Sequence, residues 1–411
     1  MKLKLLILSQ YFPPEIGAPQ NRLFELAIRL QKKGIDITVL TAMPNYPNME
    51  IQDDYKGLNY HYEEMDNLKV HRSSIYVSKN ISIVSRLRNY FSFVWSSFKN
   101  RKKLESNFDF ILCESPPLFL GISAYFISKS KKAKLIFNVS DLWPESAEKL
   151  GIVNNKLLLK MATYLEEFLY KKSTLVTGQT QGIVKNIKDR FPNKNTYWLP
   201  NGVDAELFKP ENENQKWRKE NGFSAQDTLF FYGGILGHAQ GLEIIIEASK
   251  AFTNKKNVHF ILMGAGPEKE KLMTLKETYK LENFHFLDPV KKTNIAEVIS
   301  SVDASIIPLK KLPLFEGAIP SKIFENLAME KPIILGVNGE AKELFIDKGK
   351  CGLHFEPENI DELVSCINKF IAEPELKKHF GKNGRKFAKA HFDRDLLANN
   401  FYNELINLKN L

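Results

Sequence analysis

Cysteine is scarce in this chain of 411 residues, which contains three. Cys113, Cys351 and Cys366 are far apart, and none belongs to a CxxC pair or has a histidine at metal-ligand spacing. This pattern argues against a disulfide framework and against a zinc site. A reducing cytoplasm is the compartment that fits such cysteine use best.

Long apolar runs are missing as well. The candidate stretches are interrupted by residues such as Arg86 and Arg88 before they reach the eighteen or more apolar residues that a transmembrane helix needs. Residues 1–8 are too short for a signal peptide and are followed directly by polar residues and two prolines, so we predict a buried strand there. We therefore expect no membrane-spanning segment.

Acidic residues are under-represented in the first half of the chain. Residues 1–200 carry a net charge of +11, and residues 201–411 carry −1. Within residues 79–103, seven Lys or Arg and no acid are interleaved with aromatic residues. Apolar residues at helical spacing there predict an amphipathic helix lying on an anionic membrane surface, and a helix packed on its own domain with a solvated basic face is the alternative. No recognised binding module accompanies the patch, so we expect no nucleic-acid partner.

The fold class follows from length and from the alternation of apolar runs with helical patterns. A chain of this size exceeds a single hydrophobic core. We predict an α/β protein with two Rossmann-like, doubly wound domains facing a central cleft. The predicted strands are residues 4–8, 35–40, 108–113, 134–139 and 174–177 in the first half and 228–232, 258–263, 284–286, 304–307 and 332–335 in the second, with helices at 22–31, 242–252 and 295–301.

The domain boundaries come from the same pattern. We predict an N-terminal domain at residues 1–205, a C-terminal domain at 206–385 and a helical segment at 386–411. Packing of that last segment back on the first domain is left open. The polar stretch 210–221 predicts a linker or a surface helix.

Two glycine-rich turns follow consecutive strands of the second half. Residues 233–241, GGILGHAQG, combine free backbone N–H groups with His238 and Gln240, which suits a diphosphate, although the glycines alone also fit a plain strand-to-helix turn. Residues 263–267, MGAGP, repeat the pattern, with Pro267 predicted at the first position of a helix. No GxxxxGK[ST] motif occurs. The candidate donor-binding residues of the two turns are Gly234, His238, Gln240, Gly264 and Gly266.

Residues 316–325, EGAIPSKIFE, carry a second set of candidates. Ser321 predicts a helix start, and Lys322 would add a fixed positive charge for phosphate. Glu325 lies one turn further on, where its carboxylate suits a pair of ribose hydroxyls. A Ser-capped amphipathic helix with Glu325 as an ordinary first-turn acid is the alternative.

In this order, the motifs resemble glycosyltransferase family 4, whose members have the GT-B fold. The resemblance spans roughly residues 3 to 400 and rests on PPEIGA after the first strand, PNGVD between the halves, the two glycine turns, and an acid followed by PSKxxE. The pieces QYFPPE, DLWP and PSKIFE resemble the branch that makes O-antigen and capsule sugars, which includes N-acetyl-L-fucosamine transferases.

The resemblance implies an activity. It implies a retaining transferase that moves a sugar, for instance N-acetyl-L-fucosamine or another N-acetylated 6-deoxyhexose, from a UDP-sugar to a polyprenyl-diphosphate-linked saccharide. From the charge asymmetry we expect the acceptor on the basic N-terminal domain and the donor on the C-terminal one, at the inner face of the plasma membrane. Cations and helix N-termini can stabilise the leaving diphosphate, so we expect no metal or other cofactor. A nucleotide-sugar 2-epimerase of the same fold is the alternative. A nicotinamide-dependent oxidoreductase would need GxGxxG after the first strand, where this chain has PPEIGA.

The resemblance also implies residue roles. Gly17 would lie over the donor diphosphate, Ser321 and Lys322 would contact phosphate oxygens, Glu325 would hold the ribose, and Glu316 would touch the transferred sugar.

This chain departs from the family pattern in two places. The Arg and Lys of the family align with Ile235 and Gln240, which would leave more of the phosphate charge to Lys322 and His238. The spacing from the acid at position 316 to the acid at 325 is one residue longer than usual.

Three further acids stand out: Asp141, and the pair Asp393 and Asp395. Asp141 follows the strand at 134–139, where it would bind sugar hydroxyls or orient the acceptor, and an N-cap role is the alternative. Asp393 and Asp395 match an acid-x-acid metal motif, but they lie in the C-terminal tail and we interpret them as a solvated charge pair.

Overall fold

The computed structural model describes residues 2–410 except Ile16, Pro47, Ile81, Leu150, Ile152, 211–214, Lys292 and Thr293. It divides into two compact units: unit 1 contains Met1–Asn201 with Arg394–Leu411, and unit 2 contains Gly202–Asp393. Ile16 of the PPEIGA loop and most of the predicted linker's first half lie outside the described residues, and the rest of that linker contains helix α7 (Gln215–Glu220).

Unit 1 is built on an eight-stranded sheet with the order β3-β4-β2-β1-β5-β6-β7-β8. Its strands pair in parallel except for β3 and β4, which are antiparallel. The central strands are the apolar runs that the sequence predicts, because a parallel strand covered on both faces needs an apolar residue at nearly every position. The strands are β1 (Lys4–Leu8), β2 (Asp36–Ala42), β3 (Tyr60–Met65), β4 (Leu68–Ser73), β5 (Phe110–Ser115), β6 (Lys134–Val139), β7 (Leu175–Gly178) and β8 (Thr196–Trp198).

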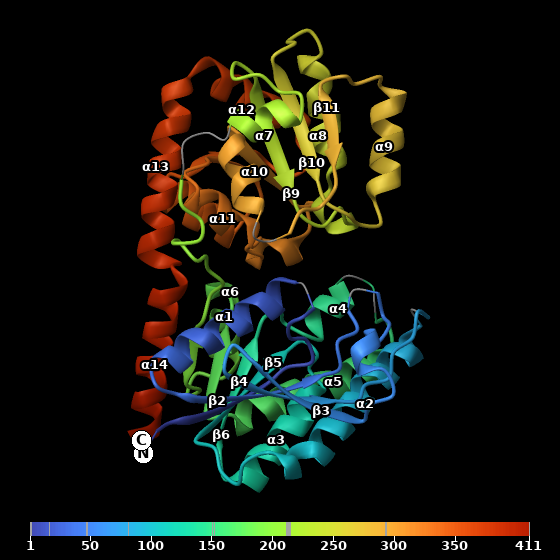
Figure 1. The fold of residues 1–411 in the computed structure, drawn as a ribbon, viewed down its shortest axis with the longest axis vertical. Coiled ribbons are helices and arrows are strands. Elements are labelled where there is room, and N and C mark those ends of the chain that lie inside the picture. Colours follow the sequence, from blue (N-terminus) through green and yellow to red (C-terminus); the bar gives the residue numbers. More distant parts are fainter. Residues whose placement is uncertain are drawn as a thin grey trace. The chain divides into compact units, whose positions relative to one another are not determined.

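Helices cover both faces of this sheet. One core cluster joins strand residues to side chains of α2, α3, α5 and α6, and a second joins them to side chains of α1 and α14, so the two groups of helices lie on opposite faces (Figure 1). The helices are α1 (Ala18–Lys32), α2 (Ile83–Asn100), α3 (Leu120–Lys131), α4 (Glu145–Lys149), α5 (Lys156–Lys172), α6 (Gln181–Arg190) and α14 (Arg394–Asn410).

The C-terminal helix α14 belongs to unit 1. Phe401, Leu405 and Leu408 are buried in its core, and Arg29 of α1 pairs with Asp395 at 2.7 Å. The segment predicted at 386–411 is divided by the structure, because α13 (Pro374–His391) continues past residue 386 within unit 2. The packing that the sequence left open is therefore made by residues 394–410.

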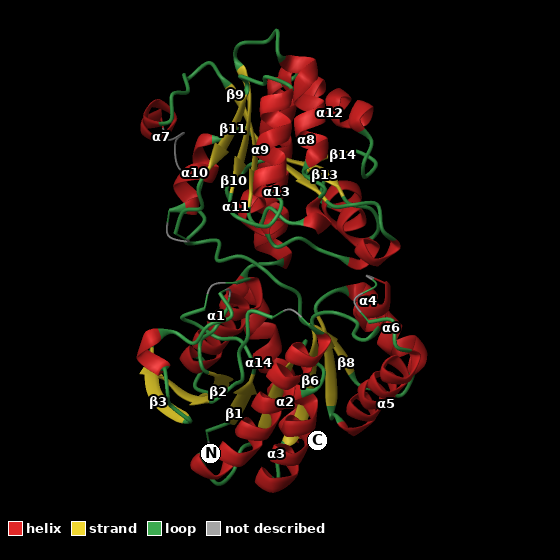
Figure 2. Ribbon diagram, turned by 90° about the vertical axis from the view of Figure 1, so that its right-hand side faces the viewer, coloured by secondary structure: helices red, strands yellow, loops and turns green. Residues whose placement is uncertain are grey.

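Unit 2 has a six-stranded sheet with the order β11-β10-β9-β12-β13-β14, and all its paired strands are parallel. Helices lie on both sides of it (Figure 2). The strands are β9 (Thr228–Gly233), β10 (Val258–Met263), β11 (Phe284–Leu287), β12 (Ala304–Pro308), β13 (Ile333–Gly336) and β14 (Gly352–His354). The helices are α7, α8 (Glu243–Ser249), α9 (Lys269–Thr278), α10 (Ile295–Ser301), α11 (Lys322–Ala328), α12 (Ile360–Ala372) and α13.

Among the residues that the structure describes, no helix is both long enough and apolar enough to cross a membrane. The Rossmann-like, doubly wound character predicted for each half is confirmed by the two parallel sheets with their covering helices.

Candidate functional site

The two glycine turns of unit 2 run side by side where β9 and β10 end. The backbone N–H of Gly234 donates to the carbonyl of Met263 at 2.9 Å, and that of Leu236 donates to the carbonyl of Ala265 at 2.9 Å. Because neighbouring parallel strands present their carboxyl ends at the same sheet edge, the turns form one glycine-lined surface there.

Glycine is required for this close approach. A Cβ atom on Gly264 would lie 1.8 Å from the carbonyl oxygen of Gly234, and one on Gly266 would lie 2.2 Å from that of Leu236. Gly264 has a φ of 154°, which other residues rarely adopt. These two glycines therefore let the turns lie in contact, and Gly234 of the first turn is exposed. Pro267 does not start a helix as predicted, because α9 begins at Lys269 with Glu268 before it.

Lys322, the first residue of α11, lies beneath the first turn. Its ammonium is 3.6 Å from the centre of the Tyr232 ring, and a Cβ atom on Gly234 would be 3.0 Å from its Nζ. The hydroxyl of Tyr232 donates to the carbonyl of Ile235 at 2.7 Å, which ties the ring to the same turn. Burial lowers the pKa of Lys322 to about 7, although the nearby carboxylate of Glu325 acts in the opposite direction.

Glu325 lies one helical turn after Lys322 and is half-buried. Ser321 precedes α11 in helical backbone conformation, and its hydroxyl makes no capping hydrogen bond to the helix. The alternative interpretation, in which the Ser321 hydroxyl caps the helix, is therefore wrong. The predicted helix start is confirmed, and the roles of Ser321 and Glu325 toward a donor stay predictions.

His238 lies on the outer side of the first glycine turn, with 74% of its side chain exposed. The ammonium of Lys310 is 3.0 Å from its Nε2, and the backbone N–H of Lys310 donates to the carbonyl of Ala239 at 3.0 Å. Gln240 ends the same short 3-10 turn, and its Oε1 would lie 2.8 Å from a Cβ atom placed on Gly237. Lys310 therefore adds a second lysine, after Lys322, at the first glycine turn.

Neither Lys310 nor Tyr232 was among the predicted site residues. Lys310 follows β12, whose carboxyl end lies at the same sheet edge as that of its neighbour β9, so strand order would have identified it. Tyr232 lies inside an apolar strand, where the sequence carries no signal for a site.

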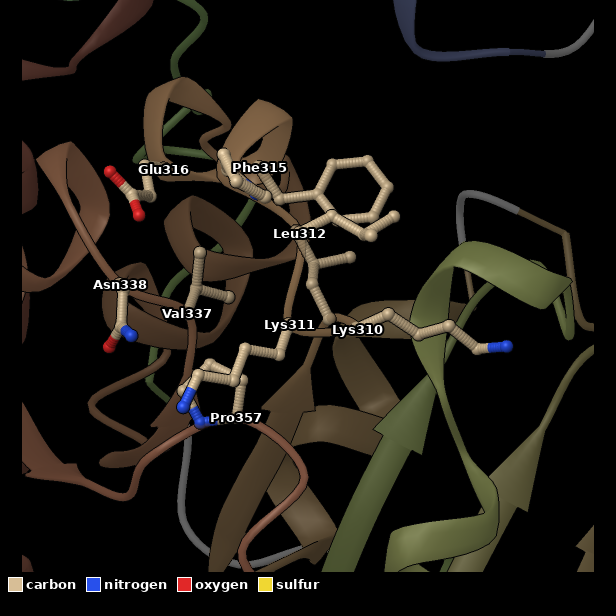
Figure 3. A pocket seen from close by; sticks show the side chains of 10 residues that line it. Lys310, Lys311, Leu312, Phe315, Glu316, Val337, Asn338 and Pro357 are labelled. Atoms are coloured by element: carbon tan, nitrogen blue, oxygen red, sulfur yellow. The ribbon is translucent and has the colours of Figure 1, made fainter. Parts of the chain in front are cut away.

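Glu316 lines a pocket of about 290 Å³ rather than the glycine turns. The pocket is formed by residues after β12, after β13 and in the loop before α12, and Lys311 and Asn338 are among its described lining residues. Figure 3 shows the carboxylate of Glu316 and the amide of Asn338 on one side of this pocket, with the side chain of Lys310 pointing away. Lys322 and Glu325 are not among the described lining residues.

In unit 1, Asp141 is held by its neighbours in sequence. Its carboxylate accepts hydrogen bonds from the hydroxyl of Ser146 and from the backbone N–H of Leu142. Desolvation raises its pKa above the usual value, although both hydrogen bonds act in the other direction. These contacts fit the alternative of a helix-start role before α4, and the role toward a substrate stays a prediction.

Gly17 precedes α1 in unit 1 with a φ of 179°, an extended conformation that any residue adopts. A Cβ atom there would meet only the flexible side chain of Gln20 at close range. The backbone of Gly17 therefore gives no conformational reason for a glycine.

A buried polar network lies close to Asp141 and was not predicted. The guanidinium of Arg22 donates to Glu114 at 2.6 Å and to the hydroxyl of Ser140 at 2.9 Å. The other carboxylate oxygen of Glu114 accepts from the amide of Asn138 at 2.6 Å. These contacts fix the carboxyl ends of β5 and β6, and Asp141 follows β6 two residues further along the chain.

Within the described part of the chain, no group of three or more His, Cys, Asp or Glu side chains is arranged to hold a metal ion. Asp395 of the acid-x-acid motif pairs with Arg29, as given above, and Arg394 pairs with Glu25.

Two family models match the chain. Glycosyltransferase Family 4 matches residues 20–207, and Glycosyl transferases group 1 matches residues 213–387. The two Rossmann-like units and the likeness to solved structures confirm the expected α/β class with the GT-B fold, and the family models identify a glycosyltransferase. The chain belongs to glycosyltransferase family 4.

Individual proteins agree with this assignment. The chain is 23% identical to WcaI of Escherichia coli, named as a colanic acid biosynthesis glycosyl transferase, over 98% of this chain and 100% of that protein. It is 20% identical to O-antigen chain mannosyltransferase C of E. coli, over 97% and 96%. The solved structure of Anabaena HepE in complex with UDP-glucose has a TM-score of 0.72 at 17% identity, covering 98% and 99%, which is a likeness of fold.

Proposed function

We propose that this protein is a retaining glycosyltransferase that moves a sugar from a UDP-sugar to a lipid-linked saccharide acceptor in O-antigen-type or capsular polysaccharide biosynthesis. The observation that carries the proposal is the ammonium of Lys322 held beneath the turn at Gly234. A lysine side chain beside a glycine turn, whose backbone a ligand can approach closely, binds phosphate when its ammonium is protonated.

The donor side is supported by charge and by similarity. Lys322, Lys310 and His238 border the first glycine turn, so a diphosphate there would meet several positive or ionisable groups. HepE, with the same fold, is solved with UDP-glucose, and we extend a UDP-sugar to this chain. From the motif resemblance we propose an N-acetylated 6-deoxyhexose such as N-acetyl-L-fucosamine as the sugar.

The chemistry we propose needs charge stabilisation on the leaving group. Breaking the bond from the anomeric carbon to the diphosphate develops negative charge on the departing oxygen, and preorganised cations lower the energy of that state. The acceptor hydroxyl then attacks from the same face while the leaving phosphate helps to take its proton, so configuration is retained. We propose that these protein cations, without a metal cofactor, supply the stabilisation.

The acceptor side is supported by the relatives. WcaI and the O-antigen mannosyltransferase are named for the assembly of bacterial polysaccharides. We propose a polyprenyl-diphosphate-linked saccharide as acceptor, reached by the protein as a peripheral enzyme at the inner face of the plasma membrane.

Turnover with a panel of UDP-sugars tests the proposal. Purified protein is incubated with each UDP-sugar, with and without a polyprenyl-diphosphate-linked saccharide and with EDTA, and UDP release and product linkage are measured. We expect UDP release only when acceptor is present, and a product linkage whose anomeric configuration matches that of the donor sugar. We also expect EDTA to leave the turnover rate unchanged. Conversion of the donor without acceptor would favour a 2-epimerase, and absence of UDP-sugar binding by calorimetry would disprove the proposal.

A further inference from the structure

Helix α2 of unit 1 places polar residues inward and apolar residues outward. On its outer side, Val84, Phe91 and Trp95 are 61%, 45% and 70% exposed. A helix that only packs on its own domain shows the opposite arrangement, with the apolar stripe buried. The residues buried on its inner side are Ser85, Asn89, Phe93, Ser96, Ser97 and Asn100.

Hydrogen bonds fix this orientation. The hydroxyl of Ser97 is 2.8 Å from that of Ser123 on α3, and the amide of Asn100 donates to Ser73 at 3.0 Å. The amide of Asn89 donates to the carbonyl of Tyr76 at 2.6 Å. Because the inner polar groups have partners, turning the helix to bury Trp95 would cost these hydrogen bonds.

Helix α5 carries a second outward apolar stripe, which the sequence analysis did not identify. Leu157, Met161, Tyr164 and Phe168 follow one another at spacings of four, three and four residues, so they share one face of the helix. They are 69%, 61%, 61% and 38% exposed. Four large apolar side chains in a row on the surface are unusual for a face that meets only water.

Aromatic contacts join the two stripes across α3. The ring of Phe98 on α2 is 5.9 Å from that of Phe126, and the ring of Tyr125 is 5.0 Å from that of Phe168 on α5. All three helices cover the same face of the unit 1 sheet, as their shared core cluster shows (Figure 2). We call this region the three-helix surface, defined by Val84, Phe91, Trp95, Phe126, Leu157, Met161, Tyr164 and Phe168.

Positive charges far outnumber negative ones on the helices of the three-helix surface. The only acids in the sequences of α2, α3 and α5 are Glu166 and Glu167. Glu166 is buried against Arg190 at 2.6 Å, and Glu167 lies 3.2 Å from Lys171. The exposed cations of these helices are Arg86, Arg88, Lys99, Lys129, Lys156, Lys160, Lys171 and Lys172.

We propose that the three-helix surface docks on an anionic phospholipid membrane, with α5 contributing as much as α2. Apolar and aromatic side chains enter the boundary between headgroups and acyl chains, and the surrounding Lys and Arg meet the lipid phosphates. Charge complementarity favours a membrane as the partner, because a surface with many cations and no unpaired acid among the described residues fits anionic lipids. The inference deepens the proposed function by naming the face through which the enzyme reaches a lipid-linked acceptor.

Vesicle flotation tests the docking. The whole chain is mixed with vesicles of phosphatidylcholine alone or with vesicles that also contain about 30% phosphatidylglycerol, an anionic lipid that gives the surface a strong negative potential. The fraction of protein bound to the vesicles is then measured. The apolar variants are Phe91→Ser/Trp95→Ser on α2 and Met161→Ser/Tyr164→Ser on α5, with Met273→Ser, an exposed residue of α9, as control. The charge variant is Lys156→Glu/Lys160→Glu, and Lys382→Glu/Lys386→Glu on α13 is its control, with exposed lysines at the same spacing.

We expect binding to the anionic vesicles only, and a decrease of about tenfold or more in the partition coefficient for each surface variant but not for the controls. We expect every variant to keep the circular dichroism spectrum of the parent, and only variants that do so are compared. Parent-like binding by the α5 variants would overturn the proposal. So would a dimer in light scattering that the same substitutions dissociate, because a second copy would then cover the surface.

A short-chain, water-soluble acceptor separates this inference from the proposed function. Turnover with that acceptor is expected to be the same in the parent and the surface variants. Loss of vesicle binding with intact turnover supports docking, and vesicle binding without any transferase activity would leave docking standing while disproving the proposed function.

Discussion

The ammonium of Lys322 lies 3.6 Å from the centre of the Tyr232 ring, directly beneath the glycine turn that follows β9. The ring face offers partial negative charge, which partly replaces the water that the ammonium has lost. Burial nevertheless lowers the pKa of Lys322 to about 7. The free protein thus holds a lysine that a bound diphosphate would recharge.

Proton uptake on UDP binding follows from that pKa. At pH 8 the free Lys322 is mostly neutral, and a nearby diphosphate raises its pKa, so binding takes up a substantial fraction of a proton. UDP affinity is therefore expected to fall as pH rises above about 7. Calorimetry in two buffers of different ionisation enthalpy measures the uptake. Lys322→Arg keeps the charge at all these pH values, and an unchanged uptake in that variant would contradict the assignment.

Substitution of Gly264 is expected to displace the first glycine turn. In Gly264→Ala the new Cβ would lie 1.8 Å from the carbonyl oxygen of Gly234, and backbone cannot move aside as a side chain can. We expect UDP affinity to fall about tenfold or more, together with a lower melting temperature. Gly222→Ala is the matched control, because its φ is also positive, at 80°, but no atom lies within 4 Å of the added Cβ. Equal effects in the two variants would show that backbone strain, not the contact between the turns, is responsible.

The central strands were predictable because their burial leaves a simple pattern. β1, β6 and β10 match the predicted runs residue for residue, since each is apolar nearly throughout. β3 was missed because it is an edge strand with half-buried and exposed residues and carries Glu63 and Glu64. The short strands β8 and β14 have three residues each, which is too few for any periodicity.

The candidate site was predictable only in part, for a related reason. The glycine turns and Lys322 stand in local motifs that a sequence displays directly. Tyr232 reads as one more buried strand residue, and only the fold places its ring against a residue ninety positions away. The placement of Glu316 in a pocket with Asn338 likewise depends on the neighbouring loop after β13.

Substitution of Glu325 is expected to change donor binding, and substitution of Glu316 is expected to change turnover. Glu325→Gln should weaken UDP binding about tenfold and abolish the preference for UDP over 2′,3′-dideoxy-UDP, because a carboxylate is the stronger acceptor for ribose hydroxyls. Glu316→Gln should lower kcat and leave UDP affinity unchanged, since Glu316 lines a pocket whose described lining residues do not include Lys322 or Glu325. Calorimetry and steady-state turnover measure both. A loss of UDP affinity in Glu316→Gln equal to that in Glu325→Gln would contradict the assignment.

The Arg22–Glu114 pair in unit 1 predicts a large effect on local stability. The side chains are 7% and 4% exposed and 2.6 Å apart, so Glu114→Gln leaves a buried guanidinium without its charged partner. Breaking such a pair costs about 3–5 kcal/mol. Because a two-unit protein need not unfold in one step, the effect is measured by hydrogen exchange of the β5 and β6 amides.

Two further variants test whether the unpaired buried charge causes the loss of hydrogen-exchange protection in Glu114→Gln. Asp189→Asn removes the exposed pair with Lys185, for which about 0–1 kcal/mol is expected. The double variant Arg22→Met/Glu114→Leu removes both buried charges at similar volume, and we expect it to restore most of the lost protection, since neither charge is then left unpaired. If the double variant loses as much protection as Glu114→Gln alone, the network with Ser140 and Asn138, rather than the unpaired charge, accounts for the loss.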